Sequence, residues 1–259
     1  MGDFEQGETI MRLILILIMC ALPIGATSAD QAQDRGQVDV AIVVSYDRSE
    51  SIDRGEADAQ IQGLIHTLRH PRFHTAVASG YFKRIALSAI AWSSFAKQEL
   101  IMPWMQIGNA QDARMAAIWL EKFRDRGERT PHGTQTDVAW GIKLAAEQMH
   151  TLPWWASKKV INMVGDGISN IGRIASIARD ETVLQGITIN GLVINPQQEQ
   201  TEVEGVKYDL DGYFREVVIG GPGAFTVVTE SPADFPRAVI NKLVLEIASR
   251  DVFRPAGNM

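Results

Sequence analysis

Short, nearly continuous apolar runs alternate with amphipathic stretches along most of the chain. The runs are VDVAIVV (38–44), IALSAIAW (85–92), VINMV (160–164), ITINGLVI (187–194) and FTVV (225–228). Uninterrupted runs of this length are typical of strands buried on both faces, as in a parallel sheet covered by helices. Between them, apolar residues recur at helical spacing over 57–68, 115–123, 138–149 and 235–247. The alternation predicts an α/β doubly wound fold, with a mostly parallel sheet and helices on both faces.

Three further segments complete the predicted domain. The stretch 95–104 favours an additional strand at the sheet edge, where Pro103 is tolerated because an edge strand leaves N–H groups unpaired. The polar stretch 195–212 indicates a surface insertion, and 251–259 a C-terminal tail. No composition shift marks a second domain, so we expect a single domain over residues 30–259.

The N-terminal segment has the layout of a secretory signal peptide. From Met11 the sequence reads MRLILILIMCALPIGATSAD, one positive charge followed by an apolar run and small residues. We expect cleavage after Ala29, and Met11 as the true start, because residues 1–10 are acidic. The apolar run is shorter than the roughly 20 residues of a membrane-spanning helix. The sequence therefore predicts residues 1–29 as a signal peptide and a periplasmic or secreted domain that meets the membrane only during export.

Charge and cysteine content narrow the function classes. The 259 residues carry a net charge of −6, which disfavours nucleic acid as a partner because phosphate binding requires a basic surface. The one cysteine, Cys20, lies in the predicted signal peptide, so the mature domain is expected to contain no disulfide.

Oxygen-bearing side chains follow the first apolar run at every second position. Asp47, Ser49 and Ser51 alternate with Arg48 and Glu50 in the stretch DRSES. Ligands of open α/β sheets bind beyond the carboxyl ends of the strands, and the run ending before Asp166 reaches the same edge. Alternating oxygen donors suit a hard divalent cation such as Mg²⁺. An alternative remains open, in which one of the two serines caps the following helix.

Two other motifs carry a family resemblance. HGTQTDVAWGI (132–142) places Gly133 and Thr134 before a helical pattern, and GDGISNIG places Asp166 at a strand end. Together with Asp-x-Ser-x-Ser, the order resembles the metal-ion-dependent adhesion site of the von Willebrand factor A-like family. The resemblance spans about 38–250. It is closest to exported bacterial A-like domains of unknown function, through VDVAIVVSYDRSESID, GITINGLVI and VIGGPGAFTVV.

This resemblance implies a set of metal ligands and a mode of action. The hydroxyls of Ser49, Ser51 and Thr134 would contact the metal, and Asp47 and Asp166 would hold waters or those hydroxyls. The cation would be Mg²⁺, with Mn²⁺ or Ca²⁺ as alternatives. An open coordination position would accept an Asp or Glu carboxylate from a partner protein. The implied function is metal-dependent protein–protein interaction, without catalytic residues.

Two rival interpretations remain. KKVINMVGDGISN is similar to a late motif of haloacid-dehalogenase phosphatases, but their mechanism requires a second Asp where Ser49 stands. That family would also have an acidic ligand at the position of Asn170. The other alternative is a structural domain of the same fold that binds no metal. The histidines at 66, 70 and 74 are expected at the surface or at helix caps, because Pro71 interrupts their helix.

Overall fold

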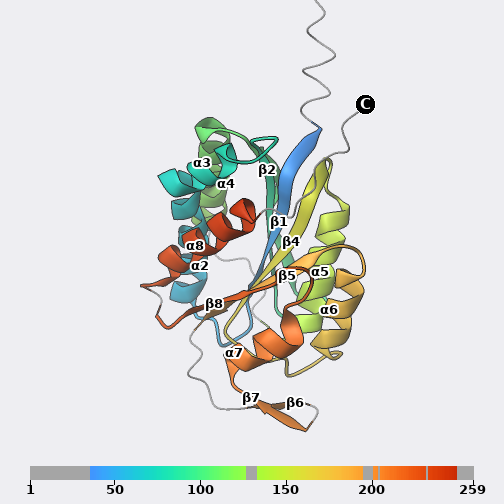
Figure 1. Ribbon diagram of the computed structural model, residues 1–259. Helices are drawn as coiled ribbons and strands as arrows, with labels where there is room; N and C mark the ends of the chain where they lie inside the picture. Colours follow the sequence, from blue (N-terminus) through green and yellow to red (C-terminus); the bar gives the residue numbers. More distant parts are fainter. Residues whose placement is uncertain (1–35, 127–132, 195–200, 204, 232, 250–259) are drawn as a thin grey trace, which may run out of the picture. The chain divides into compact units, whose positions relative to one another are not determined.

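A six-stranded sheet forms the centre of the computed structural model, with its strands in the order β3-β2-β1-β4-β5-β8 (Figure 1). Strand β3 is antiparallel to β2, and all other neighbours are parallel. The strands are β1 (Gln37–Asp47), β2 (Ile85–Trp92), β3 (Gln98–Ile107), β4 (Trp155–Gly165), β5 (Thr188–Ile194) and β8 (Thr226–Thr229). The expected edge strand with Pro103 is β3, and the predicted fold class is observed.

The structure describes residues 36–126, 133–194, 201–203, 205–231 and 233–249. Residues 1–36 and 37–259 form separate units, and every named element belongs to the second. The predicted signal peptide (1–29) and the tail (251–259) lie outside the described residues. Part of the predicted insertion is a small antiparallel hairpin, β6 (Thr201–Val203) and β7 (Val206–Tyr208).

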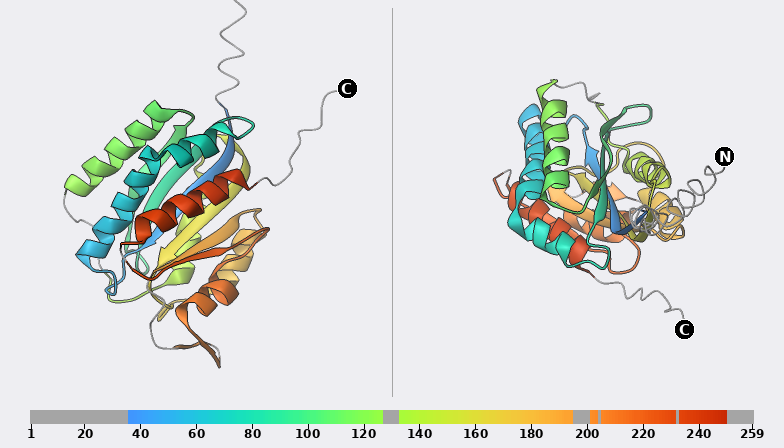
Figure 2. Two further views of the ribbon diagram at one scale, coloured as in Figure 1. Left: turned by 60° about the vertical axis from the view of Figure 1, so that its left-hand side comes forward. Right: turned by 90° about the horizontal axis from the view of Figure 1, so that it is seen from above.

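Helices cover both faces of the sheet (Figure 2). One face carries α2 (Arg54–Arg69), α3 (Pro71–Ala78), α4 (Ala110–Asp125) and α8 (Phe235–Ala248). The other carries α5 (Val138–His150), α6 (Ala175–Val183), α7 (Leu210–Tyr213) and the π-helix η1 (Phe214–Val218). Two apolar cores result, one on each side of the sheet.

Alternate side chains of β1 pack into the two cores. Ile42 and Val44 pack in the core under α2 and α8, whereas Ala41 and Val43 pack in the core under α5. Successive side chains of a strand point to opposite faces, so a strand between two helix layers must be apolar throughout. This requirement explains why the apolar runs of the sequence coincide with the central strands.

The boundary between α2 and α3 lies at His70. Its Nδ1 accepts a hydrogen bond from the backbone N–H of Arg72 at 3.2 Å, and Pro71 occupies the first turn of α3. This confirms a helix-cap role for His70. No group of three or more His, Cys, Asp or Glu that could hold a metal occurs among the described residues.

Candidate metal centre

The first predicted ligand, Asp47, lies at the carboxyl end of β1. It is buried, and its Oδ1 accepts a hydrogen bond from the backbone N–H of Ser49 at 2.8 Å. This short-range bond turns the chain immediately after the strand, so that the following residues fold over the sheet edge. No described residue donates a hydrogen bond to the other oxygen, Oδ2, although this atom is also buried.

A chain of hydroxyls connects β1 to β4. The Oγ atoms of Ser49 and Ser51 lie 3.2 Å apart, and Ser51 Oγ donates to Asp166 Oδ1 at 2.8 Å. Asp166 follows β4 directly, next to β1 in the sheet. The structure therefore brings together four of the five predicted ligands: Asp47, Ser49, Ser51 and Asp166.

Neither serine caps the following helix. The N-cap of α2 is Asp53, whose side chain accepts a hydrogen bond from the backbone N–H of Glu56 at 2.8 Å. The Glu56 carboxylate accepts in return from the backbone N–H of Asp53, which completes a capping box. The alternative explanation of the alternating serines as helix caps is therefore wrong, and their hydroxyls belong to the sheet edge.

The fifth predicted ligand, Thr134, is exposed, as is Ser51, and a second threonine two residues later borders the same group. This second threonine, Thr136, is buried. A side chain added at Gly167 would place its Cβ 3.5 Å from Thr136 Oγ1 and 4.0 Å from Ser51 Oγ, so both hydroxyls border the same point. Thr136, which the sequence motif does not include, is therefore the threonine whose hydroxyl the structure places beside that of Ser51. Thr136 directly precedes Asp137, the N-cap of α5, but no local sequence pattern distinguishes it from Thr134.

Thr136 is held in place by the loop that carries Asp166. Its backbone N–H donates to Asn170 Oδ1 at 2.9 Å, and its carbonyl accepts from the backbone N–H of Asn170 at 3.0 Å. On the other side, Gly133 forms an isolated parallel bridge with Ser49. The three loops that follow β1 and β4 and precede α5 therefore form one hydrogen-bonded unit.

Two buried carboxylates dominate the electrostatics of this edge. Burial raises the pKa of Asp47 to about 7, and the negative charge of Asp166 contributes to the rise. Burial also raises the pKa of Asp166. The nearby guanidinium of Arg48 is turned toward α2, where it donates to Gln60 Oε1 and to the carbonyl of Ala57. A bound cation would compensate both carboxylates, so the donor set fits a metal ion.

The chemistry of the donors selects a class of metal. The group consists of carboxylate and hydroxyl oxygens, without histidine or cysteine. Hard cations such as Mg²⁺, Mn²⁺ and Ca²⁺ prefer oxygen donors. Donors of this kind would suit a hard divalent ion at the carboxyl edge of β1 and β4.

The buried Asp47 gives the metal-free protein an unusual pH dependence. Because its pKa in the folded state lies above its ordinary value, the folded state retains a proton that the unfolded state releases between about pH 4 and pH 7. The contribution of Asp47 to the free energy of unfolding therefore falls as the pH rises from about 4 to about 7. In EDTA, urea unfolding of the parent should lose about 2–3 kcal/mol between pH 5 and pH 7.5, relative to Asp47→Asn. An identical pH dependence in both proteins would contradict a buried, protonated Asp47.

Comparison with known families gives one match and one negative result. A family described as "Protein of unknown function (DUF1194)" matches residues 37–251. The search of curated proteins gave no match.

Solved structures share the fold at low sequence identity. Proximal thread matrix protein 1 of the mussel byssus, with a zinc-occupied MIDAS motif, is 17% identical, with a TM-score of 0.51 over 82% of this chain and 48% of that one. The pilus adhesin SpaC of Lactobacillus rhamnosus GG is 14% identical, with a TM-score of 0.52 over 82% and 30%. A von Willebrand factor type A protein of Catenulispora acidiphila is 13% identical, with a TM-score of 0.51 over 82% and 42%.

These matches confirm the expected resemblance to von Willebrand factor A domains and the α/β fold that it implies. This chain spans less than half the length of each of the three proteins. At such identities, the likeness carries the fold alone.

Proposed function

The chain belongs to the DUF1194 family of proteins of unknown function, and we propose that it is an exported domain that binds one divalent cation and uses it to hold a carboxylate of a partner protein. One observation carries this proposal. Two buried carboxylates, Asp47 and Asp166, meet a row of hydroxyls at the carboxyl edge of the sheet, and no described residue donates to Asp47 Oδ2.

The proposed ligand set differs from the expected one at a single position. The hydroxyls of Ser49, Ser51 and Thr136 contact the cation, with Thr136 in place of Thr134. Asp47 and Asp166 hold the hydroxyls or the waters of the ion and balance its charge. Mg²⁺ is the proposed ion, with Mn²⁺ and Ca²⁺ as alternatives. Zinc at the MIDAS motif of proximal thread matrix protein 1 supports a divalent cation without selecting among them.

The donor set supports adhesion better than catalysis. Neutral hydroxyl ligands leave a divalent cation strongly electrophilic, so it attracts a carboxylate from an Asp or Glu of a partner. Such binding requires neither a nucleophile nor a proton donor. A phosphatase mechanism is disfavoured, because Ser49 stands where a second Asp is needed and Asn170 bonds the backbone of Thr136.

The proposed site of action is outside the cytoplasm, in the periplasm or in the secreted fraction. This rests on the predicted signal peptide, which lies outside the described residues. No helix in the described part of the chain is long and apolar enough to cross a membrane. The net charge of −6 supports a protein partner in place of nucleic acid.

Metal binding is tested by thermal unfolding of the purified protein in EDTA and in millimolar Mg²⁺ or Mn²⁺. A ligand at about 100 times its dissociation constant stabilises the folded state by roughly 2.7 kcal/mol. For a domain near this size, that corresponds to a rise in unfolding temperature of about 5–10 °C. An unchanged unfolding temperature with every ion would favour the alternative of a structural domain without metal.

The variant Asp166→Ala distinguishes the effect of this carboxylate on metal binding from its effect on the stability of the metal-free protein. The variant should show a much smaller metal-induced rise, because the carboxylate that holds Ser51 is missing. In EDTA it should unfold at a higher temperature than the parent, because Asp166 raises the pKa of the buried Asp47 by repulsion. Both are read from the same melting curves. A metal-free variant less stable than the parent would contradict the proposed repulsion.

A further inference from the structure

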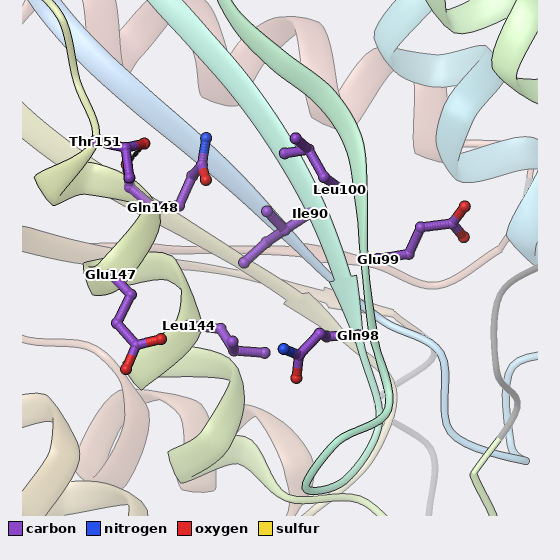
Figure 3. A pocket seen from close by; sticks show the side chains of 8 residues that line it. All are labelled: Ile90, Gln98, Glu99, Leu100, Leu144, Glu147, Gln148 and Thr151. Carbon is purple, nitrogen blue, oxygen red and sulfur yellow. Dashed lines mark hydrogen bonds between the residues drawn. The ribbon is translucent and has the colours of Figure 1, made fainter.

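A groove of about 220 Å³ lies between helix α5 and the strands β2 and β3 (Figure 3). Its lining residues are Ile90, Gln98, Glu99, Leu100, Leu144, Glu147, Gln148 and Thr151. Enclosed ligand sites usually measure about 300–1,000 Å³, so the groove is small for a cofactor. It is also open, since Leu100 is 50% exposed. Its size suits one or two side chains of a bound segment.

The walls of the groove are fixed by hydrogen bonds. Gln148 Nε2 donates to Ser88 Oγ at 3.0 Å, which ties α5 to β2. The indole N–H of Trp104, on β3, donates to the carbonyl of Gln148 at 3.0 Å. The groove is therefore a preformed feature, and binding would not need to order its walls.

One end of the groove reaches the proposed metal centre. In Figure 3, Gln98 and Leu144 face each other at the end near the β2–β3 turn. That turn touches the metal-site loop, because a Cβ at Gly133 would lie 2.3 Å from Ser93 Oγ. The backbone N–H of Asp137, next to Thr136, donates to the carbonyl of Ser93 at 2.8 Å.

An aromatic pair, the exposed Phe95 and the partly buried Trp140, lies between the metal loop and the groove. Phe95, in the β2–β3 turn, is 74% exposed, and its ring centroid lies 4.9 Å from that of Trp140 on α5. Leu144 follows Trp140 by one helical turn and so continues the apolar surface into the groove. A large aromatic side chain left this exposed beside a ligand site favours contact with a partner.

A carboxylate, that of Glu147, lies beyond the apolar part of the groove. Glu147 lines the groove one turn of α5 after Leu144 and lies on the exposed face of the helix. Glu99, in contrast, is next to Gln98, and its side chain points away from α5 (Figure 3). Lys143 lies 3.8 Å from Glu147 and also stacks 5.4 Å from the Trp140 ring, toward the metal edge. Along α5, the exposed surface therefore runs from Trp140 through Leu144 to the carboxylate of Glu147.

We propose that this surface binds an extended segment of a partner protein that carries an Asp or Glu, then an apolar side chain, then a Lys or Arg. The acidic residue ligates the cation, so this inference rests on the proposed function. The apolar side chain lies against Phe95 and Leu144, and the basic residue meets Glu147. From Trp140 to Thr151 the helix advances about 16 Å, which five or six extended residues span.

The test is selection from a display library of random peptides of about twelve residues on the Mg²⁺-loaded protein, with elution by EDTA. The selected peptides are then titrated against the parent and two groove variants, Leu100→Arg and Glu147→Lys. Leu184→Arg is the matched control, because Leu184 is also an exposed leucine and lies outside the groove. The metal-induced rise in unfolding temperature shows that each variant is folded.

The expected peptides share an acidic, an apolar and a basic residue in that order. Leu100→Arg should weaken their binding about tenfold or more, Glu147→Lys should do so only for peptides with the basic residue, and the control should bind as the parent does. Metal-dependent acidic peptides that bind all variants equally would overturn the groove but keep the proposed function. Peptides that remain bound in EDTA would overturn the link between groove and metal. No EDTA-released peptide at all would count against both.

Discussion

Replacing Thr136 by alanine is expected to abolish the rise of about 5–10 °C that Mg²⁺ or Mn²⁺ produces, while Thr134→Ala leaves it intact. The reason is geometric. The Thr136 hydroxyl borders the same point at Gly167 as that of Ser51, and no atom of Thr134 is among the three heavy atoms nearest to that point. The two threonines are two residues apart, so each is a matched control for the other. The measurement is thermal unfolding in EDTA and in the metal.

A third variant tests whether the hydroxyl of Thr136, and not the shape of its side chain, is responsible for the metal-induced rise. Thr136→Ser keeps the oxygen and should retain most of the metal-induced rise. In EDTA, all three variants should unfold within a few degrees of the parent, because the backbone of Thr136 makes the bonds to Asn170. Loss of the rise in Thr134→Ala, with retention in Thr136→Ala, would restore the original assignment and contradict the one from the structure.

The sequence predicted the sheet well because its strands face two cores. A strand such as β2, Ile85–Trp92, is buried at every position and must therefore read as an unbroken apolar run. Predicted and observed bounds agree there at both ends. The edge strand β3 is only partly buried, and it spans Gln98–Ile107 where 95–104 was expected.

Helix faces were harder to predict. In α4, Met115 and Trp119 were expected on the buried stripe with Ala116, but both are exposed, and Ala113 and Ala117 are buried beside Ala116. Small residues allow α4 to approach its neighbours closely, which a pattern of large apolar residues cannot reveal. Trp119 instead uses its indole N–H to reach the carbonyl of Ile101 at 3.0 Å.

The candidate site was predictable where the strand ends fix it. Asp47 ends β1 and Asp166 follows the adjacent parallel strand β4, so the fold alone brings them to one edge. The choice between Thr134 and Thr136 depends on how a loop folds back on Asn170, and no local pattern encodes that contact. The helix cap, in contrast, was encoded, since Asp53 and Glu56 have the spacing of a capping box.

The largest loss of stability is expected from Lys242→Met. Lys242 and Glu246 form a fully buried ion pair on α8, and Asn190 Nδ2 on β5 donates to Glu246 Oε1 at 2.9 Å. Removing the ammonium leaves the Glu246 carboxylate buried without a counter-charge. Breaking such a pair costs about 3–5 kcal/mol. We expect urea unfolding to show that loss, with a fall in unfolding temperature of about 6–20 °C.

Removing both charges shows how much of the loss in stability comes from the unpaired carboxylate and how much from changed packing. The double variant Lys242→Met, Glu246→Leu buries no lone charge, so it should be more stable than Lys242→Met alone. It should still fall about 1–3 kcal/mol below the parent, because Asn190 Nδ2 loses its acceptor. If the double variant is less stable than Lys242→Met, the loss in the single variant does not come from a buried Glu246 carboxylate without a counter-charge. The pair lies in the core under α8, so the metal-induced rise should survive in both variants.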